Sequence, residues 1–150
     1  MITQEGMETG GIIRHLFIKP AHKQPMRPVS EVTAINGEGL SSDASCGSSK
    51  RQVLLIEEET LDELSLAPGD LRENIVVAGL LMAGTPSQTR LRVGRAELEV
   101  TMDCAPCDFL DRLRLGLQQE MIGRRGTLCR VILGGVIRIG DSISWTTSTR

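Results

Sequence analysis

The 150-residue chain is poor in aromatic side chains, with two Phe, one Trp and no Tyr. Proteins that bind single-stranded nucleic acid stack the bases on aromatic side chains, so this scarcity argues against that class. The formal net charge of −2 also leaves no excess of positive charge for a phosphate backbone. The sequence therefore predicts no nucleic-acid partner.

Long apolar runs are missing as well, since no stretch approaches the ~20 residues needed to span a bilayer. The first ten residues are polar and acidic and lack the basic and apolar regions of a signal peptide. We therefore expect no membrane partner and a cytosolic protein, with a flexible leader at 1–10 followed by one domain at 11–150. In the cytosol, its four cysteines would be thiols, metal ligands or transient redox groups.

Short strand-like segments dominate the pattern, and only two helices are predicted, at 57–66 and 108–121. The expected strands cover 11–20, 31–35, 52–56, 75–77, 91–93, 96–102, 127–133 and 136–145, with a Gly- and Ser-rich loop at 37–50. Gly94-Arg95 suits the two-residue type II′ turn of a hairpin. Because regular βαβ alternation is absent, the pattern favours a β-rich, barrel-like domain over a doubly wound sheet.

Cys104 and Cys107 stand three residues apart, directly after a predicted strand and at the start of a predicted helix. Unpaired N–H groups at a helix start lower the pKa of a thiol, whereas the neighbouring aspartates would raise it. A cysteine placed in this way can be a nucleophile, a redox partner, a metal ligand or a sulfur carrier. The alternative is that both are small buried hydrophobic residues at the end of a strand.

Other cysteine chemistries have less support. A zinc site would need Cys46 and Cys129 to complete the set, but there is no second CxxC pair. A thioredoxin-like site would need a βαβ pattern around the pair. The only histidines, His15 and His22, stand near no other obvious catalytic group, so a Cys–His hydrolase is not supported.

Two polar segments could bind a ligand. Residues 68–75 combine turn formers with Arg, Glu and Asn, and form either a polar connection or a set of hydrogen-bonding groups for a heterocycle or phosphate. Residues 123–126 place two arginines between glycines, which suits either a solvated turn or an anion site. Arg51, before a predicted strand, belongs to the same class.

Taken in order, these segments resemble the MOSC domain, the C-terminal domain of molybdenum cofactor sulfurase. The matching pieces are Gly39-Leu40 with Asp43, residues 51–56, Pro68-Gly69, residues 73–75, Gly79-Leu80, Val93-Gly94, residues 98–101, Pro106-Cys107 and residues 126–141. The resemblance implies a β-rich, barrel-like fold. It also implies binding of a molybdenum cofactor, which is a pterin dithiolene carrying phosphate, or carriage of sulfur from a cysteine desulfurase.

The resemblance also implies which residues form the site. The family's characteristic cysteine falls on Cys107, as a persulfide carrier or molybdenum ligand. The implied cofactor-binding residues are Asp43, Arg51, Glu73, Asn74, Arg124 and Arg125. Many small members carry histidine where this chain has Ser45. If that histidine takes part in catalysis, this chain would bind or carry without the family's alternative activity, reduction of N-hydroxylated substrates at molybdenum. A non-catalytic interaction module is the third alternative.

Overall fold

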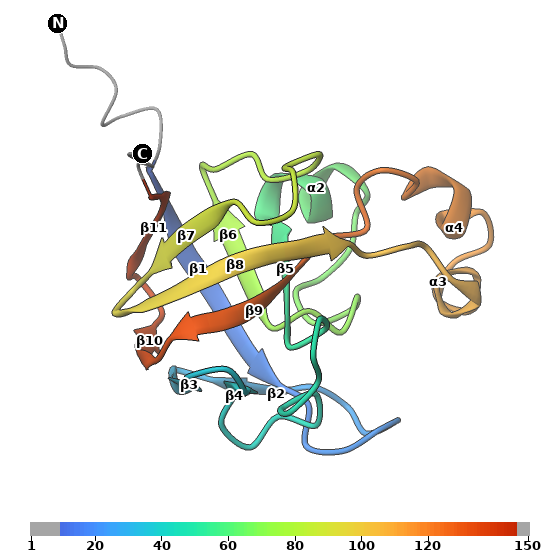
Figure 1. Ribbon diagram of the computed structural model, residues 1–150. Helices are drawn as coiled ribbons and strands as arrows, with labels where there is room; N and C mark the ends of the chain where they lie inside the picture. The colour runs from blue at the N-terminus through green and yellow to red at the C-terminus, as the bar shows by residue number, and fades with distance from the viewer. Residues whose placement is uncertain (1–9, 147–150) are drawn as a thin grey trace, which may run out of the picture.

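The structure is a computed structural model that describes residues 10–146. Its main element is a closed barrel of seven strands in the order β11-β7-β8-β9-β5-β6-β1, closed by pairing of β11 with β1 (Figure 1). The barrel strands are β1 (Gly10–Ile18), β5 (Val53–Glu57), β6 (Ile75–Ala78), β7 (Arg90–Val93), β8 (Ala96–Asp103), β9 (Thr127–Leu133) and β11 (Ser142–Trp145). The predicted β-rich, barrel-like fold is confirmed.

The remaining elements lie around this barrel. β2 (Arg27–Val29) pairs with the end of β1, and a second sheet has the order β10-β3-β4. The strands of that sheet are β10 (Gly135–Arg138), β3 (Glu31–Ile35) and β4 (Gly39–Leu40). The described helices are α2 (Glu58–Glu63), α3 (Asp108–Leu113) and α4 (Leu117–Glu120). Within residues 10–146, no helix has the length and apolar character needed to cross a membrane.

Strand β5 forms part of the barrel wall and is buried along its whole length. Val53 and Leu55 belong to the main hydrophobic cluster, which contains most of the buried residues of the barrel strands. Ile56 belongs to a second cluster, which it shares with residues of α2, α3 and α4. Because successive side chains of a strand point to opposite faces, Leu54 and Ile56 face outward from the barrel. This wall therefore has an apolar outer face that other groups can cover.

The predicted helix at 108–121 is wrong, because the structure breaks it into α3 and α4. Arg114 has an extended backbone and Gly116 has a φ of 90°, so neither continues a right-handed helix. Leu115 between them is 90% exposed. The apolar spacing was correct for Leu110, Leu117 and Met121, which are buried, but two short helices place them rather than one long helix.

The single strand predicted at 136–145 is wrong, because the structure splits it into β10, in the second sheet, and β11, in the barrel. The other boundaries differ from prediction by a few residues. β1 already begins at Gly10, the last residue of the predicted leader, and residues 1–9 lie outside the described part. β4 lies within the segment predicted to be a loop, and β2 lies where no strand was predicted. At the hairpin between β7 and β8, Gly94 has a φ of 58° and Arg95 has no positive φ, as a type II′ turn requires.

Candidate functional site

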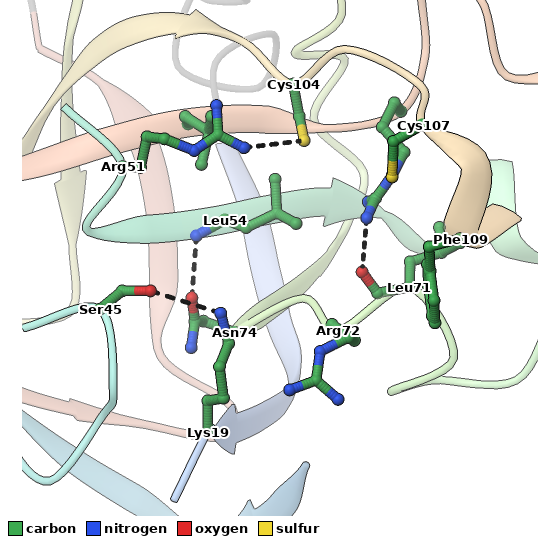
Figure 2. Close-up of a pocket in the computed structure, with 12 residues that line it drawn as sticks. Lys19, Ser45, Arg51, Leu54, Leu71, Arg72, Asn74, Cys104, Cys107 and Phe109 are labelled. Carbon is green, nitrogen blue, oxygen red and sulfur yellow. Dashed lines mark hydrogen bonds between the residues drawn. The ribbon is translucent and has the colours of Figure 1, made fainter. Parts of the chain in front are cut away.

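A pocket of about 280 Å³ lies against the outer face of the barrel wall (Figure 2). Part of its lining is the pair Leu54 and Leu128, which face each other across β5 and β9. The complete lining consists of Lys19, Ser45, Arg51, Leu54, Leu71, Arg72, Asn74, Cys104, Cys107, Phe109, Arg125 and Leu128. Its volume lies near the lower end of the range for small-molecule sites, roughly 300–1,000 Å³.

Four cationic side chains line this pocket, and its lining includes no Asp or Glu. Lys19 follows β1, Arg51 precedes β5, and Arg72 and Arg125 precede β6 and β9. The four therefore come from separate parts of the sequence, and the barrel brings them together. A concave site lined by charges of one sign attracts ligands of the opposite sign. The pocket suits an anion.

Arg125 is the buried member of this group, with 6% of its surface exposed. Its Nη2 donates a hydrogen bond to the carbonyl oxygen of Leu71 at 3.0 Å. Its Nε and Nη1 are buried and have no partner within the described part of the chain. Buried polar groups are nearly always paired, so the two unpaired nitrogen atoms leave this guanidinium with donors that an anion could occupy.

Gly126 allows the chain to turn directly after Arg125. It has a φ of +129°, and a Cβ there would lie 2.8 Å from Cδ1 of Leu54 and 3.0 Å from the carbonyl oxygen of Leu55. Only glycine fits this close approach without displacing the pocket floor. The Arg-Gly pair therefore combines a charged group with the backbone conformation that seats it beside β5.

Lys19 also lines the pocket, and its Nζ donates to Oγ of Ser45 at 3.3 Å. Burial lowers the pKa of the Lys19 ammonium, and the charges of Arg72, Arg51 and Arg125 lower it further, whereas Asp43 raises it. The arginines are thus close enough for Lys19 to experience their charge. An anion bound among them would offset this repulsion.

The lowered pKa of Lys19 leads to a prediction about the pH dependence of sulfate binding. Above its pKa the amine is neutral, so binding of sulfate, whose own charge is constant here, should weaken as the pH rises from neutral towards about 10. In a Lys19→Arg variant the charge persists, so the affinity should fall less than in wild-type protein over the same range. Isothermal titration of sulfate at several pH values measures both, and equal pH profiles would contradict the prediction.

Two thiols also reach the pocket. Cys107 is exposed and sits directly before α3, whereas Cys104 is 7% exposed and packs with Leu54 and Leu128. Nη2 of Arg51 lies 3.9 Å from Sγ of Cys104. Figure 2 marks this contact with a dashed line. The pair predicted from spacing therefore shares one site, but its members differ in access to solvent.

Asp43 and Asn74 form a buried network behind the lining. Oδ1 of Asn74 accepts from the Leu54 N–H at 2.9 Å, and its Nδ2 donates to Oδ1 of Asp43 at 3.1 Å. Asp43 in turn accepts from the backbone N–H groups of Lys19 at 2.7 Å and Ser45 at 3.0 Å. The network fixes both residues at one side of the pocket. Asn74 lines the pocket, whereas Asp43 lies behind the lining and holds Lys19, Ser45 and Asn74 through hydrogen bonds.

Glu73 was predicted to bind the cofactor, but its side chain does not face the pocket. Its side chain is fully buried, and its carboxylate accepts from the backbone N–H groups of Gly69 and Leu71. Burial raises the pKa of this carboxyl, while the hydrogen bonds and Arg125 act in the opposite direction. Glu73 does not line the pocket. It holds the turn that presents the Leu71 carbonyl to Arg125.

Arg124 also lies outside the pocket lining, although its neighbour Arg125 is inside. Its guanidinium pairs with Glu63 at 3.1 Å and donates to the carbonyl oxygen of Glu120.

The structure gives no support to the zinc alternative. Residues 10–146 hold no group of three or more Cys, His, Asp or Glu that could bind a metal ion. Cys129 is fully buried, and burial raises the pKa of its thiol well above the ordinary value.

The model of the MOSC domain matches residues 42–144 of the chain. The chain belongs to the MOSC domain family. Among solved structures, the YuaD protein from Bacillus subtilis superposes with a TM-score of 0.81 and 16% identity, covering 93% of this chain and 97% of that one. YiiM from Geobacillus stearothermophilus gives 0.73 and 17%, covering 91% and 75%. At these identities the likeness concerns the fold. No curated protein sequence matches the chain.

In this MOSC domain, sequence reasoning missed one of the pocket's cations, Lys19, and included Arg72 only as part of the polar segment 68–75. Lys19 stands at the end of a predicted strand, just before Pro20, and this was a weak signal that it lies at a barrel edge. Arg72 directly precedes the Glu73-Asn74 motif and has a φ of 62°, unusual for a non-glycine residue. No sequence pattern predicts this backbone conformation, which Arg72 adopts where it lines the pocket.

Proposed function

We propose that this MOSC domain binds a molybdenum cofactor in the cationic pocket, with Cys107 as the protein's ligand to molybdenum. The carrying observation is the combination of four cationic groups, no lining carboxylate and an exposed thiol in one small cavity. A phosphate-bearing pterin dithiolene needs positive charge for its phosphate. Molybdenum bound through sulfur suits a soft thiolate ligand. The residues present therefore fit the group.

Each side chain has a defined task in this proposal. Lys19, Arg72 and Arg125 hold the anionic end, and Arg125 supplies its two unpaired nitrogen atoms as hydrogen-bond donors. Asn74 and Asp43 keep Lys19 and Ser45 in position. When bound, the cofactor supplies a molybdenum centre for redox or sulfur chemistry. Ser45 contributes a hydroxyl at the place where many small members have histidine, so this chain offers no imidazole there.

Sulfur carriage by Cys107 is a second candidate function, supported by the exposure of this thiol at the pocket. The donor would be a persulfide, such as that of a cysteine desulfurase. The Cys107 thiolate attacks the terminal sulfur of the donor, a new S–S bond forms on Cys107, and the donor's S–S bond breaks. The donor leaves as a thiolate, and the proton remains on the transferred sulfur, so atoms and charge balance.

Purification without oxygen from a host that makes the cofactor tests the main proposal. We expect molybdenum and a pterin in comparable molar amounts, both retained through gel filtration. Protein that retains neither under molybdenum-sufficient conditions would contradict cofactor binding. Separately, incubation with a cysteine desulfurase and cysteine, followed by mass spectrometry, should add one sulfur to Cys107. Absence of that added mass would contradict sulfur carriage.

Replacing Arg125 separates anion binding from the fold. Arg125→Met removes the cation with its two unpaired nitrogen atoms, together with the hydrogen bond to Leu71, and keeps an unbranched apolar side chain at this position. Wild-type protein should gain stability in inorganic phosphate through preferential binding to the folded state, and the variant should lose most of that gain. Thermal unfolding with and without phosphate measures this. Arg124→Met is the matched control, and an equal loss in both variants would refute the assignment.

A further inference from the structure

Cys104 is a buried thiol for which the proposed function has no use, although it lines the same pocket as Cys107. We propose that Cys104 is a second sulfur-binding site, which receives sulfane sulfur from a Cys107 persulfide and holds it beside Arg51. This inference rests on sulfur carriage by Cys107 and goes beyond it, because it assigns an internal acceptor and a direction of transfer, from the exposed thiol to the buried one.

The placement of the two sulfur atoms supports a transfer. Figure 2 shows both side chains directed into one cavity, and residues 104–107 form neither helix nor strand. A persulfide extends Cys107 by one S–S bond of about 2.05 Å, so the outer sulfur reaches further than the thiol itself. Cys107 is exposed and can meet a donor, whereas Cys104 is only 7% exposed and cannot readily do so.

The surroundings of Cys104 favour a sulfur anion at that position. Nη2 of Arg51 is 3.9 Å from its Sγ, which favours a sulfur anion, whereas the carbonyl oxygen of Ala105, also at 3.9 Å, accepts only from the protonated thiol. A guanidinium cation at this distance in a partly buried site attracts a persulfide anion more strongly than it would in water. Leu54 and Leu128 pack against Cys104 and keep solvent thiols away from bound sulfur. The site would therefore shield sulfur bound to Cys104 from thiols in solution.

The transfer step balances without an added oxidant. The Cys104 thiolate attacks the outer sulfur of the Cys107 persulfide, a new S–S bond forms on Cys104, and the old S–S bond breaks. Cys107 leaves as a thiolate and is ready to accept again. The proton travels with the sulfane sulfur and is then lost to solvent, leaving the persulfide anion opposite Arg51. Cys104 is oxidised as the Cys107 persulfide is reduced.

A time course of sulfur loading tests the relay. Wild-type protein is mixed with cysteine persulfide, quenched with an alkylating agent at intervals, digested with trypsin and sequenced by tandem mass spectrometry. Added sulfur should appear first on Cys107 and later mainly on Cys104. In Cys107→Ala, loading of Cys104 should be at least about tenfold slower, because a buried thiol reacts poorly with an external donor. In Cys104→Ala, the sulfur should remain on Cys107.

Variants of Arg51 test whether its charge holds sulfur on Cys104. A loss of packing alone would not change how sulfur is divided between Cys104 and Cys107. Arg51→Met should return the added sulfur to Cys107, and Arg51→Lys should restore part of the Cys104 share. Sulfur on Cys107 alone in wild-type protein would overturn the relay while leaving sulfur carriage intact, as would equal Cys104 loading rates with and without Cys107. Sulfur on neither cysteine would overturn both. Cys46, in a separate tryptic peptide, reports non-specific labelling.

Discussion

Cys107→Ala should lower the molybdenum retained by the purified protein at least about tenfold, because changes at residues that merely support a metal ligand already cost 10- to 100-fold in affinity. The same variant should accept no sulfur at position 107. Its fold should be unchanged, since the side chain is exposed and lies outside the barrel core. Metal analysis and thermal unfolding of the same preparation measure both effects.

The matched control for that experiment is Cys46→Ala. Cys46 is a partly exposed free thiol outside the pocket lining, and burial together with Glu38 and Asp43 raises its pKa. This variant should retain molybdenum as wild-type protein does. Equal molybdenum contents in the two variants would remove Cys107 from the proposed ligand role, and an equal loss in both would point to a general effect of removing a thiol.

Asn74→Ala should lower the free energy of unfolding by about 3 kcal/mol, because each buried partner left unpaired costs roughly 1–3 kcal/mol. The substitution leaves the Leu54 N–H, the Phe17 carbonyl and Asp43 without their contacts to this side chain. Anion binding should weaken too, since Asp43 would lose a neighbour that fixes it beneath Lys19. Chemical denaturation and sulfate titration measure the two effects.

Asn74→Asp distinguishes the network from simple packing. The new carboxylate can still accept from the Leu54 N–H, but it places a second negative charge opposite Asp43. Two carboxylates in one buried site raise the pKa of one of them. A raised carboxyl pKa destabilises the fold at neutral pH, so stability should recover as the pH falls through that pKa. A variant whose stability loss is independent of pH would contradict the assigned contact.

Sequence patterns sufficed for the barrel because its strands carry strong local signals. In β8, Ala96, Leu98 and Val100 alternate with more polar neighbours, and all three are buried. The broken helix shows where such signals fail. The apolar spacing of 108–121 fits one helix, yet the backbone at Gly116 takes a left-handed conformation that ends it. A glycine inside an amphipathic pattern predicts a lower helix propensity, not the place of a break.

The site was only partly predictable, for a different reason. The family resemblance indicated Arg51, Asn74, Cys107 and Arg125, which the barrel does bring together. Glu73, which directly precedes Asn74, and Asp43 were predicted with them, but backbone N–H groups donate to their carboxylates and neither side chain lines the pocket. Which side of a loop faces a cavity depends on contacts between segments far apart in the chain. Local patterns carry no record of those contacts.

The position of the pocket on the outer surface of the closed barrel has a consequence for divergence. The barrel interior is filled by its own side chains, whereas the ligand-facing groups lie mostly at strand ends and connections. Substitutions among Lys19, Arg51, Arg72 and Ser45 can therefore change the charge and shape of the pocket without repacking the interior. Conversely, side chains of the barrel interior can be substituted while the residues that line the pocket stay the same. A scaffold built in this way can exchange chemistries over time at little cost to folding.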